Sequence, residues 1–293
     1  METLFHQYTE YDPLRKVVIG RYREYARDVA YVERVNEAQK KGLPEGHQLS
    51  AEFRNLRDLL ENQGVEVLEP DYAGPFVYDQ LTPRDLGVVV GDRFLLCHMA
   101  TKSRRYEAAG IFRFLKHTPV GEPLVLIPDS PEMLMEGGDI LVDGERIFVG
   151  LSGRTNRAGV EWMKRTFGDA FEVFEVPLKT PDEGEDVLHL DCAFNILDDS
   201  HAVIYPEGLK RIPSAILQGY ELTEVTREEQ QALATNFLTL SPQTILTRDH
   251  PHGKRVARLI RDQGNQFVEI PFDAAPATGG SLRCCTLPLI RGR

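Results

Sequence analysis

The sequence predicts a single α/β domain over residues 1–293 in which one structural unit is repeated around an axis. Pairs of apolar strands with turn residues between them begin about every 50 residues, a period typical of radially repeated architectures. Helical patterns alternate with these pairs, and no linker-like stretch marks a domain boundary. The expected strand pairs lie at residues 87–96, 139–150, 193–205 and 237–247, and residues 285–290 form half of a fifth pair.

The other elements follow from local patterns along the chain. Residues 16–20 are an apolar strand after a turn-forming Asp-Pro pair. Residues 22–48 are polar and irregular, a pattern typical of a flap or of a helix with a loose end. Apolar residues spaced for one helical face predict a helix over residues 53–60 that ends at Gly64. Similar reasoning predicts helices at 159–167, from Thr226 onward and at 256–260, and strands at 65–68 and 267–270.

Composition limits the kind of partner. The net charge is −11 at pH 7, which argues against nucleic acid or an anionic membrane and suits a small basic substrate. No apolar run is long enough to predict a membrane span, and the first residues lack the pattern of a signal peptide. The four cysteines show no paired metal-binding spacing, so we expect a cytoplasmic protein without a structural metal.

The most informative stretch is Gly279–Leu289, in which two adjacent glycines precede two adjacent cysteines, Cys284 and Cys285. A glycine turn lets another group approach the backbone closely, and a thiol after such a turn can be presented to a pocket as a nucleophile. The same residues also suit a buried strand in which the thiols are only small apolar side chains. On this stretch alone both interpretations stay open.

Polar residues at turns and strand ends favour the nucleophile. A radial repeat brings equivalent points of successive units to one axis, so these side chains could face one cavity. His189 and Asp191 are two residues apart and would share one face of a strand, with Leu190 packed on the other face. Asp85, Glu136 and Asp191 would repel one another unless a cation lay among them, either a metal ion or a guanidinium group.

Six sequence motifs stand out along the chain: Glu10–Arg21, Pro83–Gly91, Gly159–Met163, Glu136–Asp139 with Ser152–Asn156, His189–Asp191 and Arg283–Leu289. In these motifs the chain resembles the guanidino-group-modifying enzymes, which comprise arginine deiminases, dimethylarginine dimethylaminohydrolases and amidinotransferases. Similarity to amidinotransferases lies in Glu10–Arg21, Pro83–Gly91 and Gly159–Met163. Similarity to deiminases and dimethylaminohydrolases lies in Glu136–Asp139 with Ser152–Asn156. The segment His189–Asp191 is similar to deiminases and amidinotransferases, and Arg283–Leu289 is similar to deiminases. The resemblance covers nearly the whole chain and implies a fivefold pseudosymmetric β/α propeller, the pentein fold.

The resemblance implies a role for each matching residue. Cys284 matches the nucleophile, His189 the catalytic histidine, and Glu136 the acidic residue that assists the histidine. Asp85 and Asp191 match the pair that binds an unmethylated guanidinium. The remaining assignments are Arg154 and Arg104 at the substrate carboxylate, Asp79 near the substrate amine, and Cys285 in a structural role.

The implied reaction needs no metal or organic cofactor. The Cys284 thiolate attacks the guanidinium carbon and forms a covalent amidino-thioether, which an acceptor then releases. Asp191 argues against the dimethylaminohydrolase branch, which needs room for N-methyl groups, and Arg154 argues for a hydrolase. We therefore expect a deiminase-like hydrolase of free arginine or a close analogue, with an amidinotransferase as the alternative.

Two further hypotheses belong to other classes of protein. One is a non-catalytic homologue with the same propeller, which the retained set of Cys284, His189, Asp85 and Asp191 disfavours. The other is a metal-dependent hydrolase that uses the carboxylates and His98. The expected partner is a small guanidino substrate, and a homodimer stays open because the family is often dimeric.

Overall fold

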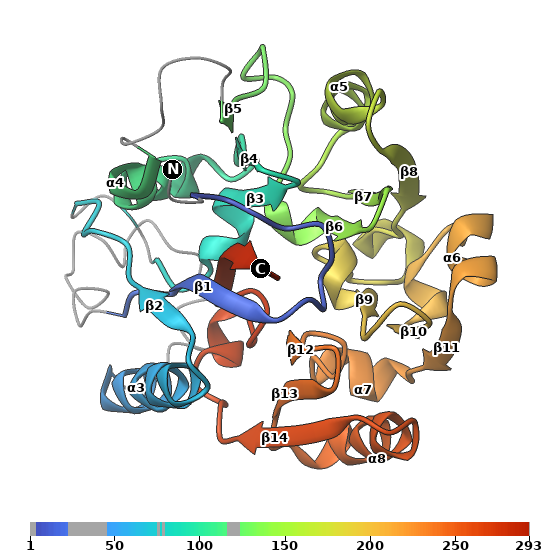
Figure 1. The fold of residues 1–293 in the computed structure, drawn as a ribbon. Coiled ribbons are helices and arrows are strands. Elements are labelled where there is room, and N and C mark those ends of the chain that lie inside the picture. The colour runs from blue at the N-terminus through green and yellow to red at the C-terminus, as the bar shows by residue number, and fades with distance from the viewer. Residues whose placement is uncertain (1–3, 23–45, 75–76, 78–79, 116–123, 293) are drawn as a thin grey trace.

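The computed structural model describes residues 4–22, 46–74, 77, 80–115 and 124–292 of the chain. In this part the strands form five sheets of three strands each. Figure 1 shows the sheets around a common centre, with helices at the periphery. The flap expected at residues 22–48 lies, for residues 23–45, outside the described part of the chain, and so does the candidate residue Asp79.

Four of the sheets share one topology. Two antiparallel strands form a hairpin, and a third strand runs parallel to the second strand of that hairpin. The four expected hairpins are therefore confirmed. The strands are β3 (Gly87–Val90), β4 (Arg93–Leu96) and β5 (Val125–Leu126); β6 (Ile140–Asp143), β7 (Arg146–Leu151) and β8 (Glu172–Pro177); β9 (Phe194–Ile196), β10 (His201–Ile204) and β11 (Glu221–Glu224); β12 (Leu238–Ser241), β13 (Thr244–Arg248) and β14 (Gln266–Ile270).

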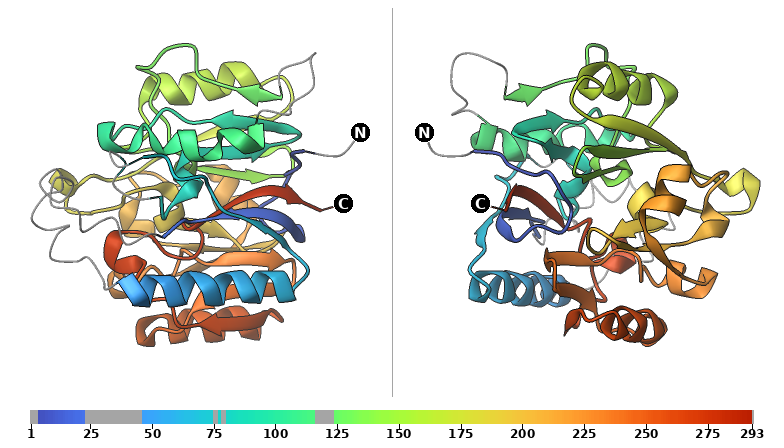
Figure 2. Two further views of the ribbon diagram at one scale, coloured as in Figure 1. Left: turned by 90° about the vertical axis from the view of Figure 1, so that its left-hand side faces the viewer. Right: turned by 45° about the vertical axis from the view of Figure 1, so that its right-hand side comes forward.

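The fifth sheet joins the two ends of the chain. β15 (Thr286–Arg291) pairs antiparallel with β1 (Leu14–Ile19), and β1 runs parallel to β2 (Glu66–Leu68). The half hairpin expected at residues 285–290 is thus completed by the N-terminal strand. Figure 2 shows β1 and β15 side by side.

A helix lies in each connection between parallel strands, because a tight turn cannot join them. These helices are α3 (Gly46–Asn62), α4 (Phe112–Leu115), α5 (Arg157–Phe167), α6 (Ser214–Gly219) and α8 (Lys254–Asp262). A short further helix, α7 (Arg227–Gln231), precedes β12. It begins with the expected capping box, in which Thr226 and Glu229 exchange hydrogen bonds between side chain and backbone. Every helix of the described residues is too short or too polar to cross a membrane.

The longest helix of the described residues packs by the face that its sequence predicts. α3 buries Leu49, Phe53, Leu56 and Leu60, which recur every three or four residues and so line one side of the helix. The same apolar cluster includes Phe272, whose ring centroid lies 5.7 Å from that of Phe53. The helix expected at residues 53–60 is confirmed as the C-terminal part of α3.

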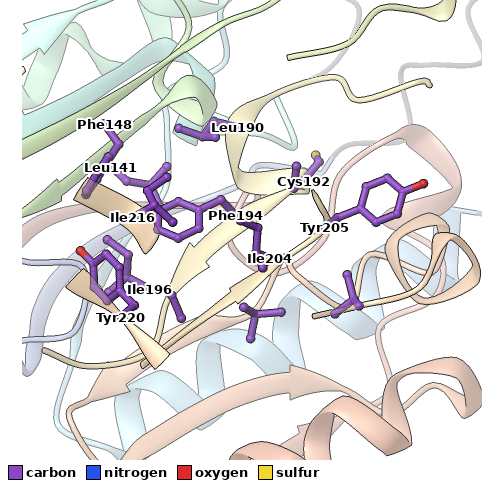
Figure 3. Close-up of a cluster of buried hydrophobic side chains, with 14 of the residues drawn as sticks. Leu141, Phe148, Leu190, Cys192, Phe194, Ile196, Ile204, Tyr205, Ile216 and Tyr220 are labelled. Atoms are coloured by element: carbon purple, nitrogen blue, oxygen red, sulfur yellow. The ribbon is translucent and has the colours of Figure 1, made fainter. Parts of the chain in front are cut away.

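A second apolar cluster includes buried side chains from the sheet of β6–β8 and from the sheet of β9–β11. The ring of Phe194 lies 5.6 Å from that of Phe148 and 5.8 Å from that of Tyr220, centroid to centroid (Figure 3). The buried side chain of Leu190 belongs to the same cluster. Leu190 therefore anchors in the core the short segment that carries His189 and Asp191.

Candidate active site

Helical turns just before the first strand of a sheet position the candidate residues. The turns are η2 (Pro83–Leu86) before β3, η5 (Gly137–Asp139) before β6, η7 (Leu190–Cys192) before β9, and residues 282–285 before β15. Asp85, Asp191 and Cys284 lie in these turns, and Glu136 and His189 directly precede η5 and η7. Because η5 contacts both η2 and η7, and β15 contacts η2, these residues from distant parts of the chain come together.

Two segments predicted as strand ends are helical turns instead. At residues 189–191 the Cys192 amide donates to the His189 carbonyl at 3.0 Å, which closes a 3₁₀ turn. At Cys284 and Cys285 the Cys285 amide donates to the Ser281 carbonyl at 2.9 Å. The strand predictions at these two places are wrong because the backbone donors bond locally and are not free for a ladder.

The imidazole of His189 lies between two carboxylates. Its Nε2 is 2.8 Å from Glu136 Oε2, and its Nδ1 is 3.7 Å from Asp85 Oδ1. The side chain is 1% exposed, so water hardly weakens either interaction. A Cβ atom on Gly138 would lie 2.8 Å from His189 Cγ. Gly138 therefore lets the imidazole pack directly on the backbone.

These surroundings keep His189 protonated. Burial disfavours the charged form, but Asp85, the hydrogen bond to Glu136 and the charge of Asp139 outweigh burial and raise the pKa of His189 to about 10. An imidazolium that persists at neutral pH can give a proton to a departing amine.

This pKa predicts a pH-dependent stability. Because the pKa of His189 rises from 6.5 to about 10 on folding, its stabilising contribution is complete below pH 6.5 and is lost as the pH rises through 10. Urea denaturation should show that the unfolding free energy lost in His189→Gln is largest near about pH 6 and shrinks toward about pH 10. The same change at the exposed His252 serves as the control. A loss for His189→Gln that stays constant over this range would contradict the prediction.

Asp85 contacts a guanidinium of the protein itself. Arg104 Nη1 donates to Asp85 Oδ2 at 2.7 Å, and Arg104 Nη2 donates to Thr82 Oγ1 at 2.8 Å. Burial opposes ionisation of Asp85, but the charges of His189 and Arg104 outweigh it and lower the pKa of Asp85. Among the described residues Asp85 Oδ1 has no hydrogen-bond partner. It is therefore a buried acceptor that a ligand N–H group could use next to His189.

The thiol of Cys284 lies beside Asp191. Its Sγ is 3.8 Å from Asp191 Oδ2, and that oxygen also accepts a hydrogen bond from Arg283 Nη1 at 2.6 Å. The other carboxylate oxygen, Asp191 Oδ1, is 3.5 Å from Cys192 Sγ. Cys285, by contrast, is buried in the apolar cluster that contains α3. The two adjacent thiols thus have different surroundings.

The candidate arginines, Arg104 and Arg154, lie next to the buried carboxylates of Asp85 and Glu136. Arg154 donates a hydrogen bond to Thr101 Oγ1, and its Nη1 is 3.8 Å from Glu136 Oε1. The side chains of Arg104 and Arg154 are 13% and 27% exposed, which places both arginines on the solvent side of the carboxylates. Their contact with a substrate carboxylate stays a prediction, as does the role of Asp79.

Asp85, Glu136 and His189 also have the geometry of a cation site. One ligand atom from each lies within 4.8 Å of the other two. Carboxylates and imidazole suit a divalent metal as well as a guanidinium. The metal hypothesis from the sequence names His98, whose Nδ1 is 3.1 Å from the Ser130 carbonyl and which lies outside this group. A metal at this place would use His189 instead.

Sequence reasoning missed three residues that contact the thiol or its carboxylate. Asn236 Nδ2 donates to Cys284 Sγ at 3.1 Å, Arg283 pairs with Asp191, and Cys192 contacts the same carboxylate. The Cys284 thiol, burial and the charge of Asp191 raise the pKa of Cys192 well above its usual range. Their only signal in the sequence is their position, since each one lies beside a candidate residue or just before a strand.

The five-sheet fold and the sequence relatives together place the chain among the guanidino-group-modifying enzymes, the pentein superfamily, whose members act on C–N bonds. The family model described as "N,N dimethylarginine dimethylhydrolase, eukaryotic" matches residues 27–291. The chain belongs to this family.

Individual relatives carry different names. The protein YkgA of Bacillus subtilis is 32% identical over 290 residues, which cover 97% of this chain and 94% of YkgA. An arginine deiminase of Listeria innocua is 25% identical over 271 residues, which cover 78% of this chain and 65% of the deiminase. Among solved structures, the amidinotransferase SxtG of Microseira wollei has the same fold, with a TM-score of 0.81, 18% identity, and coverage of 98% of this chain and 97% of SxtG.

Proposed function

We propose that the protein is a cysteine-dependent hydrolase of free arginine or a close guanidino analogue, with Cys284 as the nucleophile. The observation that carries the proposal is the position of Asp191, whose Oδ2 lies 3.8 Å from Cys284 Sγ. A planar guanidinium that donates to this carboxylate would bring its central carbon next to the sulfur. The available acceptor on Asp85 supports a second contact to the same cation.

In the proposed reaction the Cys284 thiolate attacks the guanidinium carbon and forms a C–S bond. His189 gives its proton to the departing nitrogen, so ammonia leaves as the C–N bond breaks. The neutral imidazole then takes a proton from water, which attacks the amidino-thioether and releases citrulline and the thiol. Glu136, at 2.8 Å from Nε2, orients the imidazole in both steps.

Asp191 supports an unmethylated substrate, although the description of the matching family model names dimethylarginine. A carboxylate next to the reacting carbon needs N–H donors, whereas N-methyl groups need an apolar space. Arg104 and Arg154 would bind the substrate carboxylate, and Asp79 its amine. The alternative is an amidinotransferase, because an amine could replace water as the acceptor of the same intermediate.

The rest of the proposal concerns the whole chain. We infer that the five sheets are pseudosymmetric units of one β/α propeller, which forms a single catalytic domain over residues 1–293. The repeated order of hairpin, helix and parallel strand supports this inference. The proposed reaction uses no metal or organic cofactor, and the four free cysteines suit a reducing cytoplasm.

Product analysis tests the proposed function. We expect arginine and water to give citrulline and ammonia. N,N-dimethylarginine should react at least about 100-fold more slowly, because its methyl groups replace N–H groups of the substrate that would donate to Asp191. Addition of glycine should leave citrulline as the product, detected by mass spectrometry. Ornithine together with an amidinated glycine would establish the alternative, and a protein that leaves arginine and its close guanidino analogues unchanged in both reactions would overturn the proposal.

The same assay distinguishes the proposed cysteine mechanism from the metal hypothesis. The group of Asp85, Glu136 and His189 favours a cation, so a chelator is the decisive addition. We expect EDTA to leave the rate of citrulline formation unchanged. A rate that EDTA abolishes and a divalent metal restores would instead assign the three residues to a metal centre.

A further inference from the structure

The fifth turn of the fold carries a residue for which the proposed reaction has no role. Residues 232–235 form a turn before β12, as the other turns do before β3, β6, β9 and β15. Asn236 follows this turn and lies two residues before the first residue of β12, Leu238. Asp85 and Cys284 stand at the same distance from the starts of β3 and β15. Asn236 is thus placed like two residues of the site.

Both ends of the Asn236 carboxamide contact Cys284. The Cys284 amide donates to Asn236 Oδ1 at 3.1 Å, and Asn236 Nδ2 donates to Cys284 Sγ at 3.1 Å. A backbone N–H can only donate, so the carboxamide oxygen must face it and the NH₂ group must face the sulfur. The backbone adds a third contact, from the Arg283 amide to the Asn236 carbonyl at 3.3 Å.

The surroundings of Asn236 hold the carboxamide in this position. Asn236 is 1% exposed. The side chain of Asn195 donates to the carbonyls on both sides of it, those of Thr235 at 2.8 Å and Phe237 at 3.0 Å. The Asn236 amide donates to the carbonyl of Leu233, whose φ of 58° is rare for a branched side chain. Backbone strain that the surroundings maintain is typical of functional sites.

We propose that Asn236 is a catalytic residue that donates a hydrogen bond to the Cys284 thiolate. This inference rests on the proposed function of Cys284. The Asp191 carboxylate, 3.8 Å from the sulfur, disfavours a negative charge there. The Nδ2–H group of Asn236 favours that charge and costs no reorganisation, because Asn195 and the turn already hold it. The same donor stabilises the thiolate again when the intermediate is hydrolysed.

Two variants test the donor. Asn236→Asp keeps the oxygen that accepts from the Cys284 amide but replaces the N–H donor with a second oxygen. Asn236→Ala removes both groups without burying a new charge, so it remains informative if the aspartate variant does not fold. The matched control is Asn265→Asp, another buried asparagine, which lies between α8 and β14 and outside the site. Thermal denaturation reports whether each variant is folded.

The first readout needs no substrate. Iodoacetamide is added to the protein over a range of pH, and peptide mass spectrometry measures alkylation of Cys284 alone. We expect the midpoint of this alkylation profile to move up by about one pH unit or more in the Asn236 variants, because a charge-assisted hydrogen bond to the thiolate is lost. The control variant should keep the wild-type midpoint. A folded Asn236 variant with the wild-type midpoint would overturn the inference.

The second readout is turnover of arginine. We expect kcat to fall by about 100-fold in Asn236→Asp and Asn236→Ala with KM changed by less than about threefold, as for loss of one preorganised donor. Unchanged kcat in both variants would overturn the inference. If the wild-type protein consumes no guanidino compound, the proposed function fails, whereas a shifted alkylation profile still supports the hydrogen bond to Cys284.

Discussion

Cys284→Ala is expected to lower the rate of citrulline formation by about 10⁵-fold or more, since the covalent intermediate has no other nucleophile. The thiol is buried beside Asp191 and Asn236, and alanine keeps the hydrogen bond from the backbone amide of residue 284 to Asn236 Oδ1. We therefore expect a cost in stability of only about 1 kcal/mol, the usual cost of a small deletion. Steady-state rates and denaturation curves of the same preparation measure both quantities.

The neighbouring residue supplies the matched control. Cys285→Ala removes the same atoms from a side chain that is buried in the apolar cluster of α3. It should cost about 1 kcal/mol or more in the free energy of unfolding because it leaves a small cavity, and should keep kcat/KM within about threefold of the wild type. Equal losses of activity in the two variants would contradict the assignment of a catalytic role to Cys284 and a structural role to Cys285.

Arg283→Met is expected to destabilise the protein by about 3–5 kcal/mol, because it removes the nearest cation from two buried carboxylates, those of Glu10 and Asp191. Arg283 is 1% exposed and donates to Asp191 at 2.6 Å, while its Nη2 lies 3.2 Å from Glu10 Oε2. Burial alone would raise the pKa of Glu10, but the charges of Arg283, Arg84 and Arg291 lower it. The Arg283 guanidinium thus pairs both with Asp191, the carboxylate beside Cys284, and with the buried carboxylate of Glu10.

The pH dependence of this loss has a definite sign. The pKa of Glu10 is lowered on folding, so its stabilising contribution is present above its unfolded value of 4.5 and disappears as the pH falls further. The difference between the wild type and Arg283→Met should therefore be largest at neutral pH and shrink in acid, measured by urea denaturation. Arg157→Met, at an ion pair with Glu175 whose arginine is 61% exposed, should cost less than about 1 kcal/mol. Equal losses for the two changes would contradict the prediction.

Local chemistry made the repeated fold predictable. The turn at Gly144, with a φ of 61°, needs a residue that tolerates this conformation, and apolar strands flank it on both sides. Turn residues and side-chain periodicity act between neighbours in the chain, so each hairpin and helix can be recognised separately. The spacing of the hairpins then indicates a radial repeat.

The candidate site was predictable only in part. Cys284, His189 and the carboxylates stand in short motifs, so the resemblance to known enzymes makes them candidates. Asn236 stands in no such motif, and its importance depends on the 3.1 Å contact with Cys284. The two segments predicted as strand ends are helical turns, because hydrogen bonds within a few residues compete with ladder bonds to strands far away in sequence.

The hairpins, the main helices and the short candidate motifs can be predicted from the amino-acid sequence, because they depend on residues close together in the chain. Other contacts are visible only in the folded chain: β15 pairs with β1, Arg283 joins Glu10 to Asp191, and Asn236 contacts Cys284. Each of these pairs joins residues far apart in the sequence, and no local pattern specifies which partner a buried charge or amide will find. The packing of the five sheets makes that choice.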